Sequence, residues 1–171
     1  MKNANAELSG FVSRFRVRRL TPDDLPLIFS LSAGNPQFYR YCPPAVTRES
    51  ILQDMRALPP GKTLADKFYL GFFEQENLIA VMDLIFGYPD RHTAFLGLFM
   101  MRRERQGQGI GSAIIRECFD FAKQRGMRTI RLAFAKGNRQ SEGFWKKNGF
   151  EETGVETDKG AYTAVVLQKR L

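Results

Sequence analysis

The feature that most constrains this chain of 171 residues is a glycine-rich stretch at residues 102–112, which reads RRERQGQGIGS. An apolar run ends just before it, at Met101, and an amphipathic helix pattern begins inside it, at Ile110. Glycine has no Cβ, so a ligand can approach the backbone closely and the peptide N–H groups stay accessible. Such N–H groups at a helix N-terminus favour an anion. With three arginines upstream, the stretch predicts a polyphosphate-binding loop.

Two familiar phosphate-binding loops are excluded by the spacing. A dinucleotide-binding fingerprint that starts at Gly107 needs a third glycine where Ser112 stands, and a Walker loop needs Gly-Lys-Ser/Thr, which is absent. The glycines could instead only make a tight turn between strand and helix. Three glycines in five residues exceed what a turn requires, and this favours a ligand-binding loop.

Composition and charge narrow the class of protein. Hydrophobic residues make up 43% of the chain, which suits one domain with a real core. The net charge of +8 favours an anionic partner, which could be nucleic acid, a membrane surface or a phosphorylated cofactor. Cys42 and Cys118 are too far apart for a metal or redox motif. No apolar run reaches the ~18 residues of a membrane span, so we expect a cytoplasmic protein with reduced thiols.

Hydrophobic periodicity predicts an α+β domain. Residues 1–13 have the composition of a polar tail, and residues 14–171 form the single domain. Capping signals at Thr21 and Thr47 open two helices, and residues 37–46 between them are predicted as an aromatic, proline-stiffened loop. Two further helices begin at Ile110 and Ser141. Strands are predicted at 15–20, 67–73, 77–86, 93–101, 129–135, 150–157 and 161–167. The order β-α-α-β-β-β-α-β-α-β-β describes an antiparallel meander followed by a parallel crossover.

Two motifs carry a resemblance to a known family. Gln106-x-x-Gly109-x-Gly111 is similar to the Gln/Arg-x-x-Gly-x-Gly/Ala signature of the GNAT superfamily of acyl-CoA-dependent N-acyltransferases. A second set resembles the superfamily's Asn-x-x-Ala-x-x-Phe-Tyr-x-x-x-Gly-Phe pattern with every spacing kept: Asn138, Ser141, Phe144, Trp145, Gly149 and Phe150. The resemblance implies a layered α/β/α fold with a mixed, mostly antiparallel seven-stranded sheet, about four helices, and a splay between the two central strands.

The resemblance also implies a cofactor site for acetyl-CoA as cosubstrate. The strand before the loop would pair its backbone with the pantetheine arm, and the N–H groups of the loop would hold the pyrophosphate. Arg102, Arg103 or Arg105 could meet the 3′-phosphate. A backbone N–H at Met100 would polarise the thioester carbonyl. The implied cofactor-binding residues are Phe99, Met100, Met101, Gln106, Gly107, Gln108, Gly109, Ile110, Gly111, Ser112, Asn138 and Trp145.

The second motif departs from the family at the position of the acid. Many relatives carry a tyrosine where this chain has Trp145, and that tyrosine often protonates the departing thiolate. An indole N–H donates a hydrogen bond but is no useful acid at neutral pH. Ser141, which replaces the usual alanine, is a candidate proton relay, although a helical serine often bonds its own backbone. A thiolate can also leave into water without an acid.

Three further residues are candidates for catalysis or substrate binding. Asp83 interrupts the apolar residues 78–86, and burying a carboxylate without a partner is costly. It is therefore the candidate base that deprotonates the acceptor amine, with a structural hydrogen bond or an ion pair to Arg or Lys as the alternative. Tyr39 and Tyr41 are candidate contacts for the acceptor.

The sequence favours transfer of an acetyl group from acetyl-CoA to a primary amine of a small molecule or peptide, by direct attack in a ternary complex. We expect a monomer or homodimer with no metal, no nucleic acid and no membrane partner. Two alternatives stay open. One is a CoA-binding sensor of the same fold without catalysis, and the other is a basic nucleic-acid-binding module that uses the +8 charge.

Overall fold

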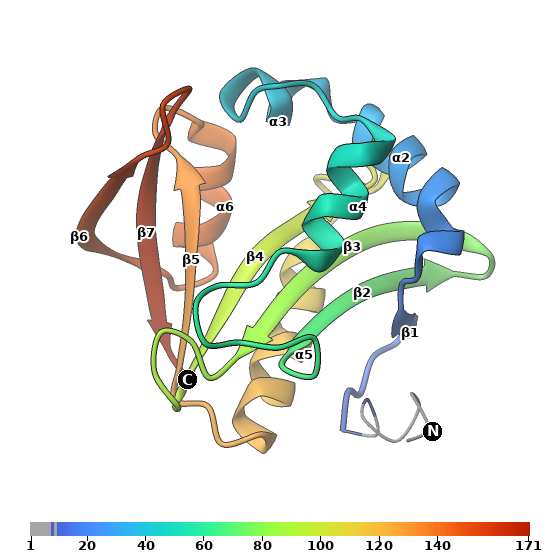
Figure 1. The fold of residues 1–171 in the computed structure, drawn as a ribbon. Helices are drawn as coiled ribbons and strands as arrows, with labels where there is room; N and C mark the ends of the chain where they lie inside the picture. Colours follow the sequence, from blue (N-terminus) through green and yellow to red (C-terminus); the bar gives the residue numbers. More distant parts are fainter. Residues whose placement is uncertain (1–7, 9) are drawn as a thin grey trace.

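A single seven-stranded sheet forms the framework of the protein. The computed structural model describes residue 8 and residues 10–171, and the strands lie in the order β1-β2-β3-β4-β5-β7-β6 (Figure 1). Neighbouring strands are antiparallel except for β4 and β5, which are parallel. The predicted mixed, mostly antiparallel sheet is therefore confirmed. Its strands are β1 (Arg16–Arg19), β2 (Lys67–Glu74), β3 (Asn77–Phe86), β4 (Thr93–Met101), β5 (Thr129–Ala135), β6 (Glu151–Asp158) and β7 (Thr163–Arg170).

Helices cover both faces of the sheet (Figure 1). Apolar side chains of α2 and α4 pack on one face and those of α5 and α6 on the other, in two separate core clusters. Among the described residues, no helix combines the length and the hydropathy needed to cross a membrane. The helices are α2 (Leu25–Ala33), α3 (Pro36–Tyr41), α4 (Arg48–Arg56), α5 (Ile110–Gln124) and α6 (Arg139–Lys147), with 3-10 turns η1 (Pro22–Asp24) and η2 (Arg103–Arg105).

Helix α3 is the element that the sequence prediction missed. Residues 37–46 were predicted as a loop, but the chain turns back into a helix at Pro36, with Asn35 as its N-cap residue. Proline suits the first helical turn because its fixed φ fits the helix. It also lacks an N–H, and an N–H at this position would have no partner within the helix. No residue of α3 is fully buried, so the helix carries no apolar stripe that periodicity could detect.

Part of the predicted polar tail belongs to the fold. Phe11 packs against Phe72 of β2 and Phe121 of α5, with ring centroids 5.6 and 4.8 Å apart. Leu8 also packs against this core cluster. Residues 1–7 and 9 of the predicted tail lie outside the described residues. Leu8 and Phe11, which precede residue 14, are therefore packed on the core.

The two parallel strands separate part-way along their length. β4 and β5 pair only from Thr93 to Leu96 and from Thr129 to Leu132. Beyond these residues β4 continues beside β3 alone and β5 beside β7 alone, and the two strands diverge (Figure 1). Backbone groups on the inner edges of both strands are thereby left without a strand partner. The splay that the resemblance implied is present.

Candidate active site

A cavity of about 560 Å³ occupies the gap between the diverging strands. Residues 96–101 of β4 form one wall and residues 132–135 of β5 form the other. The glycine loop lies at one end, and residues 34–38 at the start of α3 also line the cavity. Because the walls are strand backbone rather than only side chains, the cavity can pair with an extended ligand through peptide groups.

The glycine loop presents an unpaired backbone to this cavity. Gly107 and Gly109 have φ of +71° and +77°, a conformation that favours glycine, and a Cβ at either would meet no atom within 4 Å. Among the described residues, the N–H groups of residues 107–109 have no hydrogen-bond partner. Those of residues 110–112 open α5 and lack intrahelical partners. The loop is thus a chain of donors at the positive end of a 15-residue helix.

Of the three arginines beside the loop, one lines the cavity. Arg103 lies in its wall, whereas Arg102 donates from Nε to the carbonyl of Leu78 at 2.8 Å. Arg105 forms an ion pair with Glu74 at 2.6 Å on the other side of the loop. The side chains of Gln108 and Ile110 also turn away from the cavity, since Gln108 bonds the carbonyl of Glu104 and Ile110 is buried in the core.

The second motif supplies the opposite wall through α6. Asn138 is the N-cap residue of this helix, and its side-chain oxygen accepts a hydrogen bond from the N–H of Ser141 at 3.1 Å. Its Nδ2 has no partner among the described residues, and the side chain lies at the cavity. Ser141 also lines the cavity. The cap therefore fixes one end of the amide and leaves its donor free for a ligand.

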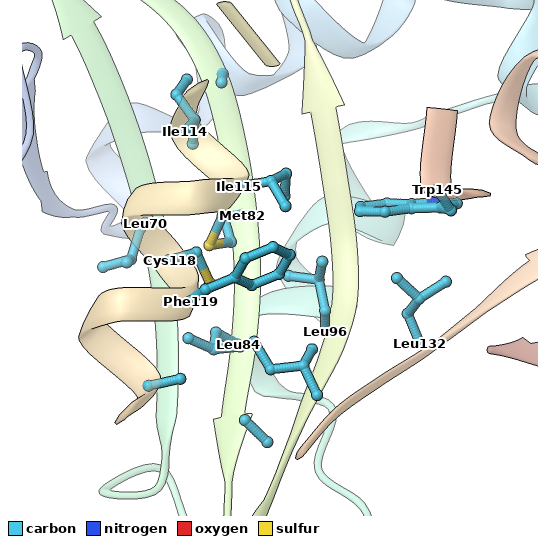
Figure 2. Close-up of a cluster of buried hydrophobic side chains, with 14 of the residues drawn as sticks. Leu70, Met82, Leu84, Leu96, Ile114, Ile115, Cys118, Phe119, Leu132 and Trp145 are labelled. Carbon is cyan, nitrogen blue, oxygen red and sulfur yellow. The ribbon is translucent and has the colours of Figure 1, made fainter. Parts of the chain in front are cut away.

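Two aromatic residues of α6 connect the cavity with the core. Phe144 stacks on Phe99 of β4, with centroids 5.9 Å apart, and its ring would lie only 3.2 Å from a Cβ at Gly111. Gly111 thus allows α5 and α6 to approach closely. Trp145 is 6% exposed and belongs to the core cluster, where its ring lies above Leu132 (Figure 2). It also lines the cavity, so packing and ligand contact are compatible at this position.

The strand register decides which N–H groups of β4 face the cavity. The N–H of Arg102 bonds the carbonyl of Ile79 in β3 at 2.7 Å. Because partners alternate along an antiparallel pair, Met100 also directs its N–H to β3, opposite Val81. Phe99 and Met101 direct theirs into the gap. The sequence prediction that the N–H of Met100 faces the thioester therefore does not fit the register, because this N–H is used within the sheet.

A buried amide network joins the glycine loop to α3, and sequence reasoning missed it. Asn35 donates from Nδ2 to the carbonyl of Met101 at 3.0 Å, and Gln106 donates to the same carbonyl at 3.1 Å. Gln106 also donates to Oδ1 of Asn35 at 2.8 Å. The side chain of Gln106, the first residue of the glycine motif, thus stabilises the end of β4. From the sequence, Asn35 and its neighbour Pro36 indicated only the end of a helix.

Asp83 lies on the face of β3 toward α4 and is 8% exposed. Its Oδ2 accepts a hydrogen bond from Nζ of Lys67 in β2 at 2.7 Å, while Oδ1 is buried without a partner. Burial raises the pKa of Asp83 to about 6, and Lys67 opposes that rise. Asp83 does not itself line the cavity, but Gly97 of β4 lies between the two.

The two predicted acceptor contacts, Tyr39 and Tyr41, lie in α3. Tyr39 packs against the α2–α4 core cluster, and burial raises the pKa of its hydroxyl. Neither Tyr39 nor Tyr41 lines the cavity; their neighbours Phe38 and Cys42 do, together with Tyr162 of the connection between β6 and β7. A predicted loop has no helical periodicity that would separate one of its aromatic residues from another.

Comparison with known proteins identifies the family. The sequence model of the acetyltransferase (GNAT) family matches residues 35–150. The chain belongs to the GNAT family. A curated relative, an uncharacterised N-acetyltransferase of Methanocaldococcus jannaschii, is 25% identical over 169 residues, covering 90% of this chain and 68% of the relative.

Solved GNAT-fold structures superpose on nearly the whole chain. An acetyltransferase of Thermus thermophilus matches with a TM-score of 0.74 and 21% identity, covering 94% of this chain and 99% of its own. The PaiA N-acetyltransferase of Thermoplasma acidophilum, in complex with coenzyme A, matches with a TM-score of 0.68 and 21% identity, covering 93% and 100%. At this identity the likeness establishes the GNAT fold for this chain.

Proposed function

We propose that this GNAT protein transfers an acetyl group from acetyl-CoA to a primary amine of a small molecule or peptide. The observation that carries the proposal is the gap between β4 and β5, which ends at the unpaired N–H groups of the glycine loop. An extended pantetheine arm fits a gap walled by free strand edges. A pyrophosphate fits donors at a helix N-terminus, with Arg103 beside it.

Backbone N–H groups and side chains would then have separate roles in the reaction. The N–H of Phe99, which faces the gap, would polarise the thioester carbonyl as an oxyanion hole. Asp83 would accept the proton that the amine loses as its lone pair forms the new C–N bond. The C–S bond breaks as the carbonyl re-forms. The thiolate takes a proton from water or through Ser141, because Trp145 offers no acid.

Equilibrium binding of CoA tests the first half of this proposal, and turnover tests the second. We expect CoA to bind in titration calorimetry and acetyl-CoA to release its thiol when a panel of primary amines is added. Folded protein that binds no CoA at millimolar ligand would contradict the cofactor assignment. CoA binding without turnover on any amine would favour a sensor of the same fold over an enzyme.

A further inference from the structure

The charged residues of the cavity belong to one half of it. Of the described residues that line the cavity, only Arg103 and Lys147 are charged, and both are basic. Arg103 lies beside the glycine loop, and Lys147 lies in α6, which packs on the α5 side of the sheet. None of the described lining residues is an aspartate or a glutamate. The positive charges are therefore in the half that the proposed cofactor occupies.

The other half of the cavity is uncharged and lies on the α3 side of the sheet. Phe38 of α3 and Leu98 of β4 both pack against the α2–α4 core cluster. Ala133 of β5 and Ala164 of β7 are next to strand residues of the opposite cluster, so alternation along a strand turns their side chains to the α3 side. All four residues line the cavity. This half is thus walled by apolar side chains.

Two further residues meet across the far end of this half. Helix α3 begins beside the glycine loop, where Asn35 bonds the carbonyl of Met101, and it ends with Cys42 as its C-cap residue. Burial raises the pKa of Tyr162, and Cys42 adds to that rise, so the end of α3 and the turn before β7 approach each other. Both residues line the cavity. We call the six uncharged residues the α3 pocket: Phe38, Cys42, Leu98, Ala133, Tyr162 and Ala164.

Two carboxylates lie behind the wall of the cavity rather than in it. Asp83 is behind Gly97, where a Cβ would lie 2.9 Å from Oδ2 of the carboxylate. That oxygen accepts a hydrogen bond from Nζ of Lys67 at 2.7 Å, and the charge of Lys67 also acts on Asp54 of α4. Two carboxylates share one ammonium group there. They leave no more than one negative charge to balance a cation in the cavity.

An uncharged pocket selects acceptors by their charge. The reacting nitrogen must lie beside the thioester, so the rest of the acceptor lies against the α3 pocket. An alkyl or aromatic group gains free energy from burial there. A second ammonium group would instead leave water without a carboxylate partner, which is strongly unfavourable. Rejection through an uncompensated charge is a general source of specificity.

We propose that the acceptor is a primary amine with a single positive charge on an apolar or aromatic body, which the α3 pocket holds, and that polyamines are poor acceptors. The inference rests on the proposed function, whose acceptor class it narrows. In the reaction the C–S bond of the thioester breaks and the C–N bond forms. The proton that the nitrogen loses balances the proton that the thiolate gains, and the apolar body takes no part in the chemistry.

A matched pair of acceptors tests this selection by charge. Butylamine and its diamine counterpart, putrescine, have the same carbon chain and differ by one amino group. At saturating acetyl-CoA we expect kcat/KM to be at least ~10-fold higher for butylamine, because putrescine must desolvate its second charge without a partner. Phenethylamine should exceed both, since its ring buries more apolar surface. Putrescine or spermidine used as well as butylamine would overturn the inference and leave the proposed function standing.

Cys42→Asp adds the carboxylate that the α3 pocket lacks. We expect the ratio of kcat/KM for putrescine to that for butylamine to rise at least ~10-fold. Cys42→Asn has nearly the same shape without the charge, and Gln53→Glu adds a charge on exposed α4 outside the cavity, so both should keep the wild-type ratio. Each ratio compares two acceptors in one variant, so a general loss of activity cancels. An unchanged ratio in folded Cys42→Asp would overturn the placement of the acceptor.

Phe38→Ala tests the apolar wall of the pocket. We expect kcat/KM for phenethylamine to fall ~10-fold relative to that for ethylamine, which buries little apolar surface. Phe29→Ala is the matched control, because Phe29 packs against the same core cluster but does not line the cavity. A wild-type ratio in Phe38→Ala would overturn the role of this wall. A wild-type protein that binds CoA but acetylates none of these amines would overturn the proposed function, and this inference with it.

Discussion

Asp83 shows how one side chain acquires a role from residues distant in the sequence. Its carboxylate interrupts an apolar strand, and its partner Lys67 lies 16 positions earlier. Oδ1 is buried without a partner among the described residues, and Gly97 leaves space beside Oδ2. Of the two alternatives that the sequence left open for Asp83, the ion pair with lysine is present, and the role as a base stays a prediction.

The raised pKa of Asp83 predicts a pH-dependent contribution to stability. The folded value of about 6 exceeds the ordinary value of 3.8, so the folded state binds the proton more tightly than the unfolded chain. This contribution is fully present below about pH 4 and is lost as the pH rises through 6. In urea unfolding, the wild-type protein should lose roughly 2–3 kcal/mol relative to Asp83→Asn between pH 4 and 7. A difference that does not change with pH would contradict the assignment.

Gly109 is the residue that most directly tests the proposed cofactor loop. Asp at this position combines a positive φ with a negative charge against the proposed pyrophosphate site. We expect Gly109→Asp to weaken CoA binding by at least ~100-fold in calorimetry, because several charge-assisted hydrogen bonds are lost.

Gly154→Asp is the control for backbone strain at Gly109. Gly154 lies in β6, away from the cavity, with φ of +82° and an equally open Cβ position. It should show a similar change in stability and normal CoA binding. Normal CoA binding by folded Gly109→Asp would disprove the placement of the loop.

At the scale of elements, the site depends on where β4 and β5 stop pairing. Four residues on each strand hold the two halves of the sheet together, and the rest of each inner edge is free. The bulge at Gly97 and the amide network on Met101 shape β4 beyond that point. On the other side, α6 closes the gap with Asn138 at its start. Because this N-cap residue also lines the cavity, the proposed site would link helix stability with binding.

Asn138→Ala should therefore lower both quantities. Loss of the cap should cost ~1 kcal/mol in the free energy of unfolding, and loss of the Nδ2 donor should weaken CoA binding about three- to ten-fold. Thr47→Ala removes the N-cap hydrogen bond of α4, away from the cavity, and is the matched control. We expect a comparable stability loss with unchanged CoA affinity. Equal CoA affinity in both variants would remove Asn138 from the cofactor site.

At the scale of the whole molecule, part of the basic charge is used inside the fold, in ion pairs and in hydrogen bonds to the backbone. Two of the three arginines beside the loop serve the fold, and Arg18 pairs with Asp24 at 2.7 Å. The cavity, the glycine loop and α6 instead form one candidate site, which lies between the two halves of the sheet. The two cysteines can be used to test this arrangement, because Cys42 lines the cavity and Cys118 lies in the core.

Alkylation by iodoacetamide should distinguish Cys42 from Cys118 in the folded protein. Cys118 is buried and burial raises its pKa to about 12, so its thiol should stay unmodified. Half-buried Cys42 should react slowly, since burial raises its pKa too, and saturating CoA should slow the reaction further. Mass spectrometry of the wild-type protein and of Cys42→Ser measures both effects. Modification of Cys118, or a rate at Cys42 that CoA does not change, would contradict the geometry.

The sequence alone determined most of what is local. Apolar runs predicted β4 and β5 with their observed bounds, and glycine spacing predicted the loop between β4 and α5. Helix α3 was not predicted because it buries no apolar stripe. Phe38 in this helix and Cys42 just after it line the cavity, whereas Tyr39 and Tyr41 do not. Local patterns suffice where burial repeats with the period of the element.

Only the tertiary structure decided how these elements meet. Strand register turned the N–H of Phe99, not of Met100, into the gap, and it brought Lys67 and Gly97 to Asp83. Register and partner choice depend on contacts between residues far apart in the chain, which no local periodicity encodes. The glycine loop could be predicted because a run of consecutive backbone N–H groups is a local feature of the sequence. The surroundings of Asp83 could not be predicted, because they come from three strands.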